Sequence, residues 1–303
     1  MALSVRARFW RMLLRRMFKR QPMTIAEYRA TGRQNARFLN RIPNDVTVED
    51  VWIDDLHAEW ISPSGGEPDR VVLHLHGGGY VTGGIDSHQA MCILMAQTLK
   101  MKILLPEYRL APEHPFPAAL EDALKSYRWL LARGCKSSDV ILSGDSSGGG
   151  LALAAVLSLR DANEPLPALV VCMSPWADLT LMGQSHIANA EKESVLATDV
   201  LKGWALAYTN QAGLHNPLVS PVYGDFKNFP PLFIQVGSDE ILLDDARTLA
   251  DKAGADGVDV TLRIWEGMFH AWQVLGRLIP ESKKAFEEMK ELIHVHISSN
   301  RRG

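Results

Sequence analysis

Short apolar runs alternate with longer amphipathic stretches over most of the chain. The runs have the length of strands and lie at 71–76, 102–105, 140–143, 169–174, 232–237 and 260–265. Between them, apolar residues recur at helical spacing at 87–99, 118–131, 151–160 and 244–253. Strands that alternate with helices in this way form a mostly parallel sheet with helices on both faces. The pattern therefore predicts an α/β fold.

The alternation breaks between 179 and 216, where a helical stretch at 198–210 has no strand before it. Two helical stretches also precede the first strands, one over the first twenty residues and one at 24–39. We expect these segments to cover the end of the sheet as a cap. The predicted organisation is N-terminal cap helices at 1–45, an α/β domain at 46–178 and 217–303, and a cap insertion at 179–216.

The first twenty residues form a basic amphipathic pattern. An apolar stripe recurs at helical spacing, while arginine and lysine take most of the remaining surface; the stripe is Leu3, Ala7, Trp10, Leu14 and Met17. We expect this helix to dock its stripe on the rest of the protein. A weak contact with a membrane surface is the alternative, because basic amphipathic helices bind anionic lipids.

Composition and charge narrow the choice of partners. Lys and Arg total 32 against 35 Asp and Glu, so the formal charge of -3 gives no reason to expect nucleic acid. Cys92, Cys135 and Cys172 lie far apart without Cys-x-x-Cys spacing, which predicts reduced core cysteines. Apolar runs stay below the roughly 18 residues of a membrane span, and arginines interrupt any signal-peptide core. A cytoplasmic protein is therefore expected.

A serine lies in a Gly-rich turn between a predicted strand and a predicted helix. The segment Gly144-Asp145-Ser146-Ser147-Gly148 has the G-x-S-x-G pattern, and the strand-turn-helix context makes it a nucleophile elbow. Small residues on both sides let the strand and the helix approach closely. No Gly-Lys-[Ser/Thr] follows, which argues against a phosphate loop. Ser146 is the predicted nucleophile.

An earlier turn supplies candidate anion-binding amides. His76-Gly77-Gly78-Gly79-Tyr80 follows the strand at 71–76, and consecutive glycines allow backbone N–H groups to face an anion. Alone this is a weak signal, but acyl transfer needs such donors together with a nucleophile.

The partners of an elbow serine follow it in the order carboxylate, then histidine. Asp239 comes after the strand at 232–237 and His270 after the strand at 260–265, both at the carboxyl ends of predicted parallel strands. We expect Asp239 to orient His270 and His270 to accept the Ser146 proton. The other carboxylates that compete for the acid role are Glu240, Asp244 and Asp245, of which the last two are expected to be solvated on the following helix.

Ten histidines raise the question of a metal site. The chain has no His-Glu-x-x-His motif, and no carboxylate cluster accompanies His74 and His76 on their strand. His74 is expected to be a satisfied core or supporting group, and no metal is predicted.

The motifs together resemble those of hormone-sensitive-lipase-like esterases, the bacterial family IV carboxylesterases of the α/β-hydrolase superfamily. The matching segments lie at 76–80, 108–118, 144–149, 239–242 and 267–270, in the order of that family. Two positions depart from it: Ser147 stands where relatives often have Ala, and Glu240 where they often have Pro. The second departure bears on the acid.

The resemblance implies an α/β-hydrolase fold with a mostly parallel central sheet and a helical cap. It implies Ser146, Asp239 and His270 as catalytic residues and an oxyanion hole from the amides of three residues, Gly78, Gly79 and Ser147. The cap of such proteins shapes the acyl pocket, so the expected pocket walls are Leu201, Trp204 and Tyr208. Arg109 and Glu113, in the proline-rich stretch, are expected to fix their loop.

The resulting prediction is a serine carboxylesterase that hydrolyses short- to medium-chain acyl esters through an acyl-enzyme, without a cofactor. One alternative keeps the triad and takes amide substrates, as in deacetylases of the same superfamily. The other is a ligand-binding receptor of the gibberellin-receptor kind, which lacks the catalytic histidine. The partner is a small acyl ester, and a homodimer is left open.

Overall fold

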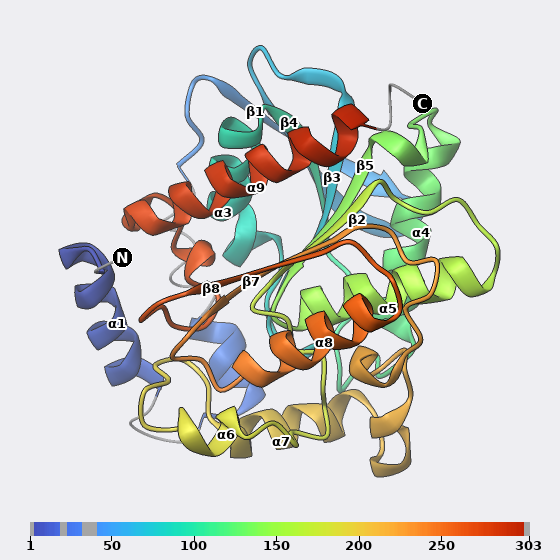
Figure 1. Cartoon of the computed structure of the whole chain (residues 1–303). Helices are drawn as coiled ribbons and strands as arrows, with labels where there is room; N and C mark the ends of the chain where they lie inside the picture. The colour runs from blue at the N-terminus through green and yellow to red at the C-terminus, as the bar shows by residue number, and fades with distance from the viewer. Residues whose placement is uncertain (1–2, 19–22, 32–40, 300–303) are drawn as a thin grey trace.

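A computed structural model describes residues 3–18, 23–31 and 41–299, and one eight-stranded sheet runs through its centre (Figure 1). The strand order is β1-β2-β4-β3-β5-β6-β7-β8. Strand β2 pairs antiparallel with β1 and with β4, and all the other neighbouring pairs are parallel. The strands are β1 (Val46–Ile53), β2 (Leu56–Pro63), β3 (Glu67–Leu75), β4 (Met101–Pro106), β5 (Val140–Asp145), β6 (Leu169–Met173), β7 (Leu232–Gly237) and β8 (Val260–Trp265).

Helices cover both faces of the sheet. On one face lie α3 (Ile85–Leu99) and α9 (Pro280–Ser299), and on the other lie α4 (Ala118–Ala132), α5 (Ser147–Asp161) and α8 (Leu243–Ala255) (Figure 1). Each predicted strand and helix of the alternating region is present, with ends shifted by a few residues. The predicted α/β fold with a mostly parallel sheet is confirmed.

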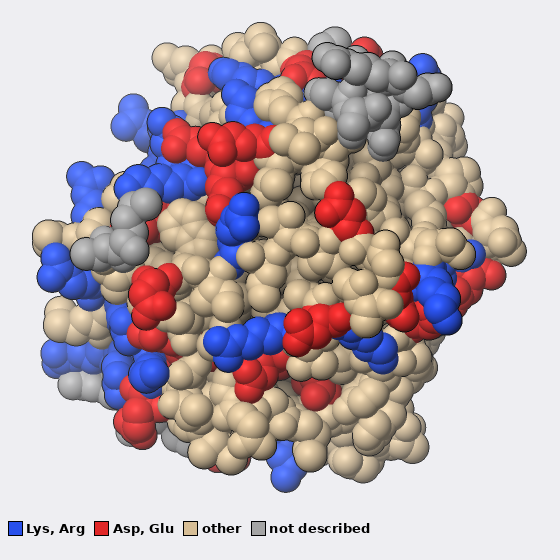
Figure 2. All heavy atoms as spheres, in the orientation of Figure 1, with Lys and Arg blue, Asp and Glu red and all other residues tan. Residues whose placement is uncertain are grey.

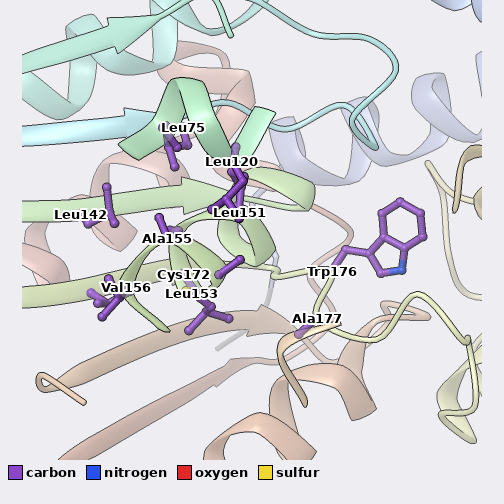
Figure 3. Packing of buried hydrophobic residues seen from close by; sticks show 14 of the residues in the cluster. Leu75, Leu120, Leu142, Leu151, Leu153, Ala155, Val156, Cys172, Trp176 and Ala177 are labelled. Carbon is purple, nitrogen blue, oxygen red and sulfur yellow. The ribbon is translucent and has the colours of Figure 1, made fainter. Parts of the chain in front are cut away.

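The alternation of side chains along each strand divides the core into two layers. Leu142 and Cys172 pack with Leu151 and Ala155 of α5, as Figure 3 shows. The adjacent Ile141 points to the opposite face, into the cluster that includes α3 and α9. Because successive strand side chains point to opposite faces, an apolar run serves both layers at once. This double burial explains why the central strands β5, β6 and β7 read as nearly continuous apolar runs.

The insertion, residues 179–216, carries two α-helices, α6 (Ser185–Ala188) and α7 (Thr198–Tyr208), followed by the short 3-10 helix η2 (Gln211–His215). Figure 1 shows α6 and α7 together along one side of the α/β layers, close to the loops that follow β7 and β8. The helix predicted at 198–210 is therefore present. The division of the chain into cap and α/β units stays a prediction.

The N-terminal helix α1 (Val5–Phe18) docks as expected. Its Ala7, Trp10 and Leu14 pack in one cluster with Phe269 and Trp272. The opposite side of α1 leaves Val5, Phe9 and Met12 exposed, and blue side chains gather along this edge in Figure 2, whereas both signs of charge mix elsewhere on that face. Contact of this helix with membranes, and a homodimer, stay predictions.

Residues 25–31 are helical, and the remainder of the helix predicted at 24–39 lies almost entirely outside the described residues. None of the helices within the described part of the chain combines the length and the apolar character needed to cross a bilayer. All three cysteines are free, and Cys92 and Cys172 are buried as predicted, whereas Cys135 is partly exposed.

Candidate active site

The predicted nucleophile lies in a tight turn at the carboxyl end of β5. Ser146 has φ 51° and ψ -124°, a conformation that costs a non-glycine residue about 1–3 kcal/mol. The turn depends on close backbone contacts, because a Cβ atom at Gly148 would overlap the carbonyl oxygen of Leu75. The sequence pattern thus corresponds to a real constraint: only glycine fits where β3 meets α5.

The histidine predicted to be the base lies next to this serine. His270 follows β8 after a short loop, and its Nε2 is 2.9 Å from the Ser146 hydroxyl oxygen. Both side chains are nearly buried, with 6% of each residue exposed. This contact joins residues 124 positions apart in the sequence. The fold therefore brings together the two groups that a serine hydrolase needs first.

The carboxylate that contacts His270 is Glu240, not Asp239. Glu240 Oε2 accepts a hydrogen bond from His270 Nδ1 at 2.8 Å, and the glutamate is fully buried. Asp239 turns the other way and forms an ion pair of 2.6 Å with Arg11 of α1. The prediction that Asp239 orients His270 was therefore wrong.

The loop after β7 explains this exchange of roles. Glu240 Oε1 accepts hydrogen bonds from the Gly237 N–H and from the Ser174 hydroxyl, each at 2.6 Å. These two donors hold the carboxylate against the end of the sheet, and the longer glutamate side chain reaches His270 from one position further along the loop. The signal in the sequence was the departure from the family pattern at position 240.

The other competing carboxylates take no part. Asp245 was expected to be solvated, but it is 2% exposed and accepts hydrogen bonds from the backbone N–H groups of Ala177 and Asp178. Asp244 accepts one from the Ser185 N–H of the insertion. Asp245 therefore holds the segment directly before the insertion, and the expectation that it would be solvated was wrong.

Burial and neighbouring charge compete for the protonation of His270. Burial lowers the pKa of its imidazole, but the hydrogen bond and negative charge of Glu240 raise it more, with help from Glu193 and Asp145. The net result is a pKa above the ordinary value of 6.5. Because a buried carboxylate only accepts hydrogen bonds, His270 carries a proton on Nδ1, and Nε2 of the neutral ring is free to accept one from Ser146.

Asp145, directly before the serine, organises the adjacent turn. It is 1% exposed and accepts hydrogen bonds from the Gly77 N–H, from His74 and from His88 at 3.0–3.3 Å. Burial would raise the pKa of Asp145, but the charges and hydrogen bonds of the two histidines outweigh it and hold the pKa well below its usual range. His74 is the satisfied core group that was predicted, and His88 is one that sequence reasoning missed.

The amides predicted for the oxyanion hole remain unused inside the protein. Among the described residues, none accepts a hydrogen bond from the N–H groups of Gly78, Gly79 or Ser147. Gly78 and Gly79 have φ of 123° and 63°, which glycine adopts without strain. The Ser147 hydroxyl accepts the Tyr80 N–H at 3.2 Å, so this departure from the family pattern supports the glycine turn.

A cavity of about 690 Å³ lies over the serine and the histidine. Its apolar walls come from α1, residue 28, the insertion and the loops after β8, and they include Leu14, Phe18, Tyr28, Leu196, Trp204 and Phe269. Trp204 lines it as predicted and packs against Gly79. The predictions for Leu201 and Tyr208 were wrong, because neither lines the cavity. Leu201 is buried in the hydrophobic core, and the ring of Tyr208 stacks on that of Tyr80 with 3.8 Å between the ring centroids.

The proline-rich loop is held by ion pairs, as predicted. Arg109 pairs with Asp122 and Glu121, and Glu113 with Arg29 from the N-terminal segment. Arg29 and Glu113 also line the cavity. Within the described ranges, no group of three or more His, Cys, Asp or Glu side chains is arranged to hold a metal ion.

Comparisons with known proteins point to the same class of enzyme as this geometry. Residues 72–274, more than half of the chain, match the family described as alpha/beta hydrolase fold. An acetyl-hydrolase of Streptomyces hygroscopicus is 44% identical over 245 residues, which are 81% of this chain and 80% of that protein. An esterase of Acinetobacter venetianus is 36% identical over 73% of this chain and 74% of its own.

Solved structures agree over nearly the whole chain. An esterase of the bacterial hormone-sensitive lipase family has a TM-score of 0.93 and 38% identity, covering 98% of this chain and all of that one. The chain belongs to this esterase family. EstE5, in a crystal soaked with p-nitrophenyl butyrate, has a TM-score of 0.92 and 37% identity, covering 97% of this chain and 99% of its own. The relatives and solved structures named here are esterases and an acetyl-hydrolase, which confirms the expected enzyme class, a hydrolase of carboxylic esters.

Proposed function

We propose that this esterase hydrolyses short- to medium-chain acyl esters with a triad of Ser146, His270 and Glu240. The observation that carries the proposal is the 2.9 Å contact between His270 Nε2 and the serine hydroxyl, in a cavity of about 690 Å³. Sites for small molecules commonly have volumes of about 300–1,000 Å³. The cavity is therefore of the size that a small ester needs.

In the first half of the reaction, Ser146 Oγ attacks the ester carbonyl carbon while His270 Nε2 accepts its proton. The carbonyl oxygen becomes an oxyanion, for which the unused amides of Gly78, Gly79 and Ser147 are the proposed donors. Glu240 stabilises the imidazolium that forms. His270 then returns the proton to the leaving alcohol, and the carbon–oxygen bond breaks to leave an acyl-enzyme.

In the second half, a water molecule attacks the acyl carbon and His270 takes its proton. The second tetrahedral intermediate collapses, the proton passes to Ser146 Oγ, and the carboxylic acid is released. No step needs a cofactor. The same steps would cleave an amide, so ester is separated from amide by measuring initial rates on matched ester and anilide acyl donors.

An ester series and a covalent label test the proposal. We expect p-nitrophenyl esters from acetate to decanoate to give the highest kcat/KM at short to medium chains, because bulky aromatic side chains line the cavity. A fluorophosphonate should inactivate the enzyme and add its mass to the peptide that holds Ser146. Labelling of a different residue, or no turnover of any ester, would refute the proposed triad.

Substitution of a cavity wall should change the preference for substrate size. Trp204→Ala removes a large aromatic side chain from the cavity, and we expect the ratio of octanoate to acetate kcat/KM to rise several-fold. Leu206→Ala is the matched control, since Leu206 lies on the same helix, is 45% exposed and does not line this cavity. An unchanged ratio in Trp204→Ala would show that the substrate does not contact this wall.

A further inference from the structure

A second buried carboxylate lies near the contact between His270 and Glu240. Glu193 belongs to the insertion, and none of its surface is exposed to solvent. Its Oε1 accepts hydrogen bonds from the backbone N–H groups of Ser194 at 2.7 Å and Val195 at 2.8 Å. In the part of the chain that the structure describes, no Lys or Arg forms an ion pair with it. A buried carboxylate without a cation is costly, so its presence calls for an explanation.

The other oxygen of Glu193 contacts the loop that carries the acid. Oε2 accepts the N–H of Ile241, the residue directly after Glu240, at 3.2 Å. Asn189 of the same insertion donates hydrogen bonds to the carbonyl oxygens of Ser238 and Glu240 at 3.0 and 2.8 Å. The insertion is therefore fastened to both sides of the acid residue.

The charges of Glu193 and His270 act on each other. Burial raises the pKa of Glu193 and Glu240 raises it further, while the positive form of His270 opposes both. Conversely, Glu193 is one of the groups that raise the pKa of His270. The other charged groups that act on the imidazole in this way are Glu240 and Asp145. Two of these carboxylates lie in the α/β layers, and only Glu193 comes from the insertion.

We propose that Glu193 is a positioning residue of the esterase reaction: it ties the insertion to the acid loop and supplies a second negative charge that stabilises the His270 imidazolium. The inference rests on the proposed function, since that imidazolium forms when Ser146 loses its proton. It makes the strength of the base depend on a docked insertion. A segment that shapes the cavity thereby also takes part in proton transfer.

The pH dependence of Glu193→Gln tests this role. His270 must be neutral to accept a proton, so kcat/KM rises with pH through the pKa of His270, which lies above 6.5 in the unaltered protein. Loss of the negative charge should move this rise to lower pH by about half a unit to one unit. We also expect kcat on the plateau to fall about threefold to tenfold, because the imidazolium is less stable.

Three variants separate charge from support of the loop. Glu191→Gln removes an exposed carboxylate two residues away and should leave the profile unchanged. Asn189→Ala removes two hydrogen bonds to the acid loop without removing charge, so it should lower the Tm and move the profile by less than Glu193→Gln does. Glu193→Asp keeps the charge but withdraws it by one methylene group. Its pH profile should therefore lie between those of the unaltered protein and Glu193→Gln. If Glu193→Gln does not fold, Glu193→Asp tests the inference on its own.

The pKa of His270 can also be measured by NMR titration in a Ser146→Ala background, which needs no turnover. This measurement separates a failure of the proposed function from a failure of the inference about Glu193. If the unaltered protein hydrolyses no ester, the proposed function fails, while the NMR pKa still tests Glu193. A pKa and a profile that stay fixed in Glu193→Gln and Glu193→Asp would overturn the inference, even if both variants lower the Tm.

Discussion

Glu240→Gln should lower kcat on p-nitrophenyl butyrate by about 10⁴-fold, while Asp239→Asn should lower it by less than about threefold. The first figure is the loss seen when the carboxylate behind the base of a serine hydrolase becomes an amide. Glutamine cannot accept hydrogen bonds with both side-chain atoms, whereas Glu240 accepts from His270, Gly237 and Ser174 at once. One of these three donors then faces the amide N–H₂ group, which cannot accept its hydrogen bond. The His270 ring loses its orientation and the proton on Nδ1.

The paired substitution distinguishes two neighbouring acids that the sequence alone does not separate. Asp239 points to Arg11, so its amide variant should reduce the stability of the α1 contact and leave proton transfer intact. Measurement of kcat for both variants, with circular dichroism to verify folding, decides between them. The reverse order of effects would restore Asp239 as the acid and contradict the geometry of the loop after β7.

Ser146→Ala should reduce kcat by about 10⁶-fold. The alanine variant keeps the cavity and the amide donors but has no oxygen to form the acyl-enzyme. The fold should survive, because alanine keeps the same Cβ atom at φ 51° and removes only the hydroxyl group. We therefore expect a nearly unchanged Tm together with the loss of turnover.

Single-turnover kinetics measure the residual rate, and Ser158→Ala is the matched control. Ser158 lies on α5, the helix that follows Ser146, about three turns further along, and is only partly buried. The same change there should leave kcat within about twofold. Retention of more than a few per cent of activity in Ser146→Ala would mean that a different group attacks the ester.

Sequence reasoning succeeds where the pattern is local. The turn around Ser146 and the run of glycines at 77–79 are each defined by neighbouring residues, and strand order then brings their ends to one edge. Ser146 and His270 were predictable because Ser146 directly follows its strand and His270 lies in the short loop after its own. The doubly buried strands were predictable for the same reason, since a parallel strand with helices on both faces has no polar side.

It fails where contacts join remote segments. Asp239 and Glu240 are adjacent acids on one loop, and their roles depend on where Arg11 of α1 lies. Glu191 and Glu193 are a similar pair: the side chain of the first is 96% exposed and the second is fully buried. No spacing rule tells such pairs apart, because the docking of α1 and of the insertion decides which acid meets solvent.

The bridge made by Arg11 has a consequence for biosynthesis. This side chain from the first helix donates to the carbonyl oxygens of Gly267 and Lys192 in addition to its ion pair with Asp239. Ser4 likewise binds Glu281, across 277 residues. Most of the apolar surface on which α1 packs, including Phe269 and Trp272, is therefore synthesised about 250 residues after the helix itself, and contacts of such long range form slowly. We expect the nascent chain to be most exposed to aggregation and proteolysis during this interval, with its N-terminal apolar stripe uncovered throughout.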